Sequence, residues 1–191
     1  MEGEAKEQRE SFSSLGWALL FVFFIIYALL AIPFKSYSQP LIVMSIIPFG
    51  MIGAVMGHWV MGMELTIMSL LGMLALIGVV VNDSLVLVDY INKRRSEGLD
   101  LQEAVLTAGS SRFRPVMLTS LTTFIGLMPL LFEKSTQAQF LIPMAVSLGF
   151  GILFATFITL LLVPVNYLLI AKAKAWLTTS HLNIIKCIKF I

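Results

Sequence analysis

Asp83 is a carboxylate inside a long apolar stretch, and it raises the main chemical question of the sequence. Asn82 precedes it, and Asp89 follows near the end of the same stretch. An ionised Asp at the centre of a membrane helix costs about 2.5–3.5 kcal/mol on insertion scales, so such a residue usually faces other helices and has a partner. Burial favours the neutral acid, and a carboxyl group whose proton affinity changes with conformation can carry a proton. We interpret Asp83 as a candidate proton carrier; the alternative is a structural hydrogen bond or ion pair between helices.

Small and polar side chains recur at helical spacing along this stretch. They follow steps of three, four and seven residues and form a stripe of Ala75, Gly78, Asn82 and Asp89. Asp83 lies about 100° around the helix from Asn82, at the edge of the stripe. The pattern favours a face turned toward other helices. Asp89 stands one turn before Lys93, and this spacing predicts an ion pair near the membrane surface.

A second polar stripe follows further along the chain. Thr119, Thr122 or Thr123, and Gly126 share one helical face, and Arg112 lies seven residues before Thr119 on the same side. A Thr hydroxyl can donate to a carboxylate or hold a water molecule in a proton path. It can equally bond to a backbone carbonyl of its own helix, which is the commoner use in membrane helices. Thr119 and Arg112 are therefore secondary candidates.

Other chemistries find little support in the sequence. His58 lies among several Met residues, and imidazole and thioether groups bind copper, but Met is ordinary apolar filler. The one cysteine, Cys187, excludes a disulfide framework or a cysteine-based metal site within the chain. No nucleophile with a neighbouring base, phosphate loop or metal-ligand cluster is present in the sequence. We expect neither an enzyme nor a bound metal or cofactor.

The elements that must position these residues follow from hydropathy. The chain of 191 residues is 58 % hydrophobic and 13 % charged, against about 25 % charged in soluble domains. Long charge-free runs approach or exceed the roughly 20 apolar residues that span a bilayer. The predicted fold class is an all-α membrane protein, a bundle of five transmembrane helices. The predicted spans are about 14–34, 41–61, 66–90, 115–132 and 141–170.

The polar segments complete this organisation. Residues 1–13 form a predicted lead-in, and residues 171–191 form a predicted tail. Asp100 and Glu103 have the spacing of a capping box, so a short surface helix is expected at about 101–109. Pro115 is expected at the first position of the fourth span, where proline is favoured. Gly53 and Gly57 form a small-xxx-small pair that lets another helix approach closely.

The placement of Lys and Arg predicts the orientation. With the N-terminus outside, ten of the 13 basic residues fall on the inner side, which supports an N-out, C-in topology. The net charge of +2 is too small to indicate nucleic acid as a partner. The acidic start lacks the features of a cleavable signal peptide, and we interpret it as interior sequence of a longer protein.

Two motifs carry a resemblance to a known family. Residues 78–90, GVVVNDSLVLVDY, and 112–129, RFRPVMLTSLTTFIGLMP, precede a final span that ends in VPV at 163–165. With the opening GEAKEQRESFSSL at 3–15, the chain resembles the C-terminal membrane segment of bacterial resistance-nodulation-division (RND) efflux pumps of the acriflavine-resistance type. The likeness covers about 11–173.

The resemblance implies a larger machine. Such pumps have twelve spans in two related halves and large periplasmic domains, and they work as homotrimers in the inner membrane. They exchange protons for drugs and other amphiphiles, and some join a periplasmic adaptor and an outer-membrane channel. This chain would hold spans eight to twelve, with 1–13 in the periplasm and 171–191 in the cytoplasm, and its partners would be the rest of the pump and the lipid bilayer.

The resemblance also assigns residues. The family's relay combines two aspartates of the fourth span with a Lys and a Thr, and the Thr maps onto Thr119 and a nearby Arg onto Arg112. The Lys position maps onto Asn82, which carries no positive charge, and Asp83 stands next to it. The implied proton-translocation residues are therefore Asp83, Asn82, Thr119 and Arg112.

Other readings of the sequence stay open at this point. One is a related superfamily member that exports lipid or protein. Another is a non-transporting fragment, or a structural or assembly subunit of a membrane complex. Insensitivity of any phenotype to substitution of Asp83 and Thr119 would favour the second of these.

Overall fold

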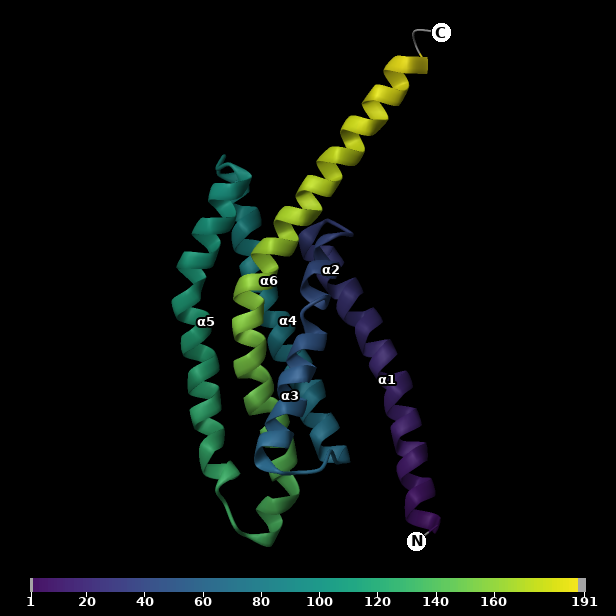
Figure 1. The fold of residues 1–191 in the computed structure, drawn as a ribbon, viewed down its shortest axis with the longest axis vertical. Coiled ribbons are helices and arrows are strands. Elements are labelled where there is room, and N and C mark those ends of the chain that lie inside the picture. Colours follow the sequence, from purple (N-terminus) through teal and green to yellow (C-terminus); the bar gives the residue numbers. More distant parts are fainter. Residues whose placement is uncertain (1, 189–191) are drawn as a thin grey trace.

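The chain forms a bundle of helices (Figure 1). The computed structural model describes the backbone of residues 2–188 and the side chains of residues 16, 17 and 20–172. The predicted lead-in 1–13, Cys187 and most of the predicted tail 171–191 lie outside the described side chains. The helices are α1 (Glu2–Phe34), α2 (Gln39–Met44), α3 (Ile47–Met61), α4 (Ile67–Ser96), α5 (Leu101–Leu131) and α6 (Thr136–Ile188).

Four segments of the described chain are long and apolar enough to cross a membrane. They are Gln39–Met61, Ile67–Ser96, Leu101–Leu131 and Thr136–Lys172, and a shorter apolar helix covers Leu20–Phe34. Each falls on a span expected from hydropathy, and the described residues contain helices and connecting turns without strands. The prediction of an all-α membrane protein is confirmed.

The second span differs from the expected single helix because it is broken into α2 and α3. Proline has no N–H, so Pro48 cannot donate to the carbonyl of Met44. Ser45 instead closes the end of α2 by donating its N–H to the carbonyl of Leu41 at 3.0 Å. The helix restarts with Pro48 in its first turn, where a missing N–H costs nothing.

The expected surface helix is not a separate element. The helix begins at Leu101, with Asp100 as its N-cap as predicted, but the Asp100 carboxylate accepts from the N–H of Gln102 at 3.3 Å and the reciprocal bond from Glu103 that would complete a capping box is absent among the described contacts. It then continues without a break to Leu131, so Pro115 lies inside α5 and not at the start of a new helix. Proline is tolerated there because membrane helices re-satisfy the freed carbonyl locally or through neighbouring groups.

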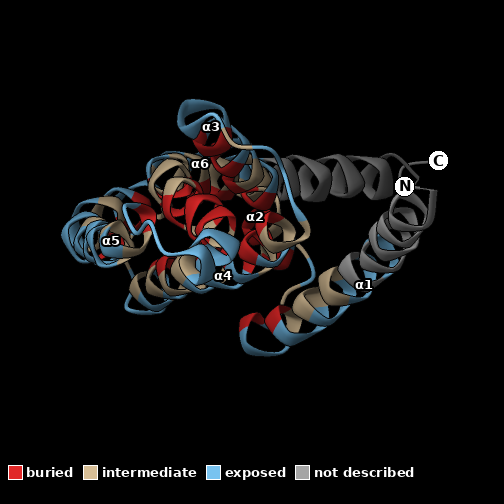
Figure 2. Cartoon of the chain, turned by 90° about the horizontal axis from the view of Figure 1, so that it is seen from below, coloured by how far each residue is buried: buried red, intermediate tan, exposed pale blue. Residues whose placement is uncertain are grey.

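Helix α6 is the central element of the bundle. It packs against α3, α4 and α5, while α1 stands at the side and contacts α2 and α4 (Figure 1). Buried residues concentrate where these helices meet (Figure 2). The core of buried apolar residues includes Ile42, Val43, Ala54, Leu76, Val80, Leu87, Val88, Ile152, Ala155 and Val163.

Glycines set the separation of α3 and α6. Gly53 faces the Cβ of Phe154, and Gly57 faces the Cβ of Phe150, both so closely that an added methyl group would overlap the phenylalanine. The small-xxx-small pair therefore does what its spacing predicts and admits a neighbouring helix.

Candidate functional site

Asp83 lies on α4 and is half-buried. Among the described residues it makes no hydrogen bond and no ion pair. Its neighbour Asn82 is exposed. An apolar helix thus carries a carboxyl group that has no partner among the described residues, in a setting where a charge is costly.

The predicted stripe on α4 forms an uncovered face of this bundle. Its members, Ala75, Gly78, Asn82 and Asp89, are all exposed. A Cβ added to Gly78 would meet nothing within 4 Å. The spacing correctly places these residues on one face, but the described residues of the other helices do not cover that face.

The threonine stripe on α5 is also uncovered. Thr119, Thr122, Thr123 and Gly126 are exposed, and only 17 % of the apolar 18-residue segment of α5 is buried, against 44–50 % of the corresponding segments of the other spans. The hydroxyl of Thr119 donates to the carbonyl of Val116 at 2.9 Å, and that of Thr123 donates to the carbonyl of Thr119 at 2.8 Å. Within the described chain, these hydroxyls serve their own helix, the commoner of the two uses anticipated. No hydrogen bond joins Thr119 to Asp83 or Asn82 among these residues.

Arg112 lies further toward the end of the bundle where α4 ends. Its guanidinium carbon stands 4.8 Å from the centre of the Tyr90 ring, within the range of a cation–π contact. Its Nε is buried and has no hydrogen-bond partner among the described residues. Arg112 lines a cavity of about 240 Å³ together with Asp89, Tyr90, Lys93, Arg94 and Glu97. The structure therefore groups Arg112 with Asp89 rather than with Asp83.

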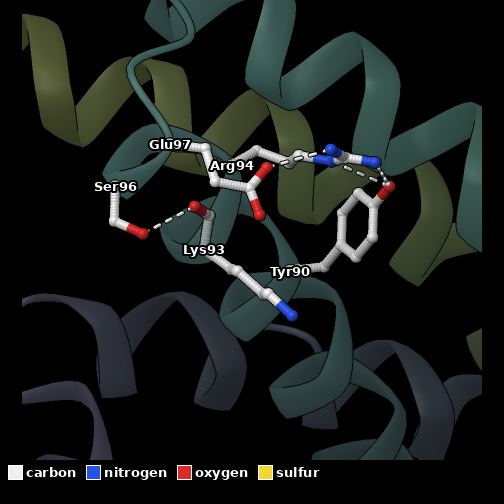
Figure 3. Close-up of polar contacts among 5 residues, drawn as sticks. All are labelled: Tyr90, Lys93, Arg94, Ser96 and Glu97. Carbon is white, nitrogen blue, oxygen red and sulfur yellow. Dashed lines mark hydrogen bonds and ion pairs between the residues drawn. The ribbon is translucent and has the colours of Figure 1, made fainter.

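Tyr90 and Arg94 organise this cavity. Arg94 donates to the Tyr90 hydroxyl from Nε at 3.0 Å and from Nη2 at 2.8 Å, and its Nη1 pairs with the Glu97 carboxylate at 2.9 Å (Figure 3). The expected Asp89–Lys93 ion pair is wrong, since Arg94–Glu97 is the one ion pair of the described residues. The basic and acidic groups at the end of α4 pair three residues apart instead of four.

His58 is a buried group at the opposite end of the bundle. Its Nδ1 lies 3.0 Å from the Ala54 carbonyl and its Nε2 lies 2.7 Å from the Ser69 hydroxyl. A carbonyl only accepts, so Nδ1 carries the hydrogen and Nε2 accepts from Ser69. Both ring nitrogens are engaged, and the side chain joins α3 to α4. No group of three or more His, Cys, Asp or Glu residues suited to a metal ion occurs in the described part of the chain.

Sequence reasoning missed one polar network. Asn92 and Gln39 exchange two amide hydrogen bonds of 2.9 Å, and Tyr167 donates its hydroxyl to Asn92 Oδ1 at 2.7 Å. The three residues connect α2, α4 and α6. Each of the three is an isolated polar residue near the end of an apolar span. Their shared position at span ends is the only signal in the sequence that could have indicated a cluster near the membrane surface.

The comparisons with known proteins agree with this architecture. The model of the AcrB/AcrD/AcrF family matches residues 1–171. The swarming motility protein SwrC of Bacillus subtilis (strain 168) is 36 % identical over 171 residues, which are 89 % of this chain and 16 % of that protein. The multidrug resistance protein MdtC of Pantoea ananatis (strain AJ13355) is 29 % identical over 182 residues, 95 % of this chain and 18 % of that protein.

Solved structures give the same result. Two crystal forms of a heavy metal efflux pump superpose with TM-scores of 0.76 and 0.78, at 28 % and 27 % identity, over 85 % and 88 % of this chain and 16 % of the pump chain. The chain thus spans 16–18 % of the length of the curated relatives that it matches. Its helices, its motifs and its relatives show that the chain belongs to the AcrB/AcrD/AcrF family and is a membrane-domain segment of an RND efflux transporter.

Proposed function

We propose that this chain contributes the C-terminal half of the proton-translocation domain of a transporter that exchanges protons for drugs or other amphiphiles. The observation that carries the proposal is Asp83, a half-buried carboxyl group inside α4 without a partner in the described chain. An intramembrane carboxylate is by default a functional candidate, because its desolvation has to be compensated by a partner or by a proton. MdtC, a relative named for multidrug resistance, supports the substrate class.

The uncovered stripes supply the second line of support. Asn82 beside Asp83 and the threonines around Thr119 form polar faces on α4 and α5 that no described helix of this chain covers. Polar faces in a bilayer require a protein partner or a water-filled cavity. We propose that the other half of the membrane domain covers them and brings its own titratable groups to Asp83, with Asn82 and Thr119 positioning the proton.

Arg112 has a different role in this scheme. It lies beside Asp89 in the cavity at the end of α4, so we propose that it tunes proton exchange with the inner aqueous phase. This requires N-out, C-in topology in the inner membrane. The position of the basic residues supports that topology. Lys35 follows the end of α1, Lys93, Arg94 and Arg95 lie in the last turn of α4, and Ser36 and Arg95 line the same cavity. The assembled form would be a homotrimer with an adaptor and an outer-membrane channel.

Asp83→Asn tests the proposal. The assembled transporter is reconstituted in liposomes, and efflux of a fluorescent amphiphile is followed together with proton movement under an imposed pH gradient. Asparagine keeps the shape of the side chain but cannot bind or release a proton, so both signals should fall to the level of empty liposomes. The control is Asp100→Asn, which makes the same change outside the apolar stretch and retains a good helix cap.

Transport at the normal rate by the Asp83→Asn variant refutes the assignment of Asp83. A structural or assembly role remains the rival function. It predicts that Asp83→Asn and Thr119→Val leave transport unchanged, whereas substitutions that disturb helix packing abolish assembly.

A further inference from the structure

A second polar cavity lies at the end of the bundle where α1 ends and α2 begins. It has a volume of about 90 Å³ and is formed by the turn between these helices and the ends of α4 and α6. Its walls are Ser36, Ser38, Gln39, Ile42, Arg95, Tyr167, Ile170 and Ala171. It shares none of these residues with the cavity around Arg112 or with the Asp83 region, so the proposed transport function does not account for it.

Three polar side chains of this cavity, those of Arg95, Ser36 and Ser38, have hydrogen-bond donors without a described partner. The side chain of Arg95 makes no ion pair and no hydrogen bond within the described residues, unlike that of its neighbour Arg94, which is bound to Glu97. The hydroxyls of Ser36 and Ser38 are also without described partners, and Ser38 does not use its side chain to cap α2. A guanidinium group and two free hydroxyls form a set that suits an oxyanion.

The floor of the cavity is fixed and has few acceptors left. Gln39 Oε1 accepts from Asn92, and Asn92 Oδ1 accepts from both Gln39 and Tyr167. The turn above is held by Tyr27, whose hydroxyl donates to the Tyr37 carbonyl at 3.1 Å. The amide oxygen of Gln39 is therefore occupied, and Gln39 and Tyr167 are held in place by hydrogen bonds within the protein.

The charged residues in and near the cavity favour a negatively charged ligand. No Asp or Glu lines the cavity. Lys35 precedes Ser36 and Lys172 follows Ala171, and both lysines are exposed without an ion pair among the described residues. The cavity thus has one lining cation, and two further lysines directly adjoin lining residues in the sequence.

The position of the cavity selects the type of anion. It lies at the end of helices that are long and apolar enough to span a membrane, where lipid head groups are expected to meet the protein. Leu41 and Leu169, which are 55 % and 59 % exposed, adjoin the lining residues Ile42 and Ile170 and offer apolar surface beside the polar groups. Basic pockets between membrane helices at this level suit the phosphate groups of anionic lipids.

We propose that this cavity binds the phosphate group of an anionic phospholipid, with Arg95 as the counter-charge and Ser36 and Ser38 as hydroxyl donors. Acyl chains would lie along Leu41 and Leu169. The site would tie the α1–α2 turn to the ends of α4 and α6.

The test is native mass spectrometry of the assembled transporter, delipidated in detergent and titrated separately with phosphatidylglycerol, phosphatidylcholine and soluble glycerol 3-phosphate. Phosphatidylglycerol should be retained in preference to phosphatidylcholine. Arg95→Gln should weaken its retention about fivefold, the effect of one basic group near a membrane surface. Arg94→Gln is the matched control, since it removes the same charge from the adjacent residue and should leave retention unchanged.

Further variants guard against a folding artefact. Arg95→Lys keeps the charge and should retain most of the binding, and the double change Ser36→Ala with Ser38→Ala should weaken it while leaving all charges in place. Equal losses in Arg94→Gln and Arg95→Gln would reveal diffuse surface attraction and overturn the proposal. Equal retention of the two lipids, or saturation by glycerol 3-phosphate alone, would also overturn the lipid assignment.

Discussion

The close approach of α3 and α6 at Gly57 allows a quantitative test by Gly57→Ala. A Cβ at this position would overlap Phe150 Cβ and would lie 2.6 Å from its Cγ and 2.9 Å from its Cδ2. The opposing atoms are the Cβ of Phe150 and the ring atoms nearest to it, which cannot move away as the end of a flexible side chain could. The substitution therefore has to push α6 away from α3.

The size of the effect follows from two opposing contributions. Overpacking of this kind costs about 1–3 kcal/mol. Ala is favoured over Gly in a helix interior by roughly 0.5–1 kcal/mol. The matched control is Gly109→Ala in α5, where an added Cβ meets nothing within 4 Å, so only the helix preference acts. Subtracting the two variants removes that preference, and Gly57→Ala should be about 1–3 kcal/mol less stable than Gly109→Ala.

The assay is equilibrium unfolding of the assembled transporter in mixed micelles with a rising fraction of dodecyl sulfate, followed by circular dichroism. Gly57→Ala should unfold at a lower dodecyl sulfate fraction than the unmodified protein, and Gly109→Ala at the same or a higher fraction. Equal stability of the two variants would refute the reasoning, because it would mean that α6 does not approach α3 at Gly57.

Three further outcomes are expected. His58→Ala should lower stability by about 1–3 kcal/mol, because it removes the buried link between α3 and α4 and leaves the Ser69 hydroxyl without its acceptor; an unchanged unfolding curve would contradict this. Tyr167→Phe should cost about 1 kcal/mol by removing the bond to Asn92, while Tyr37→Phe, at a side chain that is 81 % exposed, should be neutral in the same assay. Thr119→Val should change stability by less than about 0.5 kcal/mol, since the Thr119 hydroxyl bonds only to the Val116 carbonyl of its own helix. The same variant should reduce proton-coupled efflux if the hydroxyl positions the proton. Normal efflux would exclude that role.

Hydropathy and helix-end signals predict much of this fold. The bilayer thickness sets the length of each apolar run, and Asp100 begins α5 where its capping signal places it. The prolines are less predictable, because the same residue type has opposite outcomes. Pro48 separates α2 from α3, whereas Pro115 lies within the continuous helix α5. Whether a proline breaks a helix depends on what neighbouring groups do for the freed carbonyl, which the local sequence does not specify.

The sequence predicts which residues of the site share a helix face, but not which residues of other helices they contact. Helical periodicity correctly groups Asn82 with Asp89 on one face of α4. It says nothing about which helix lies opposite that face, so the grouping of Arg112 with Asp89 emerges only from the packing of α4 and α5. The pairing of Gln39 with Asn92 across 53 residues has no local signal, since it depends on how three helices meet.

The central place of α6 has a consequence for biogenesis. The chain is synthesised from its N-terminus, so α3, α4 and α5 enter the membrane before the helix against which all three pack. Until α6 inserts, the glycine face of α3 at Gly53 and Gly57 has no partner. The packing therefore predicts that α3, α4 and α5 associate only loosely until α6 inserts, and that α6 joins them into a single bundle.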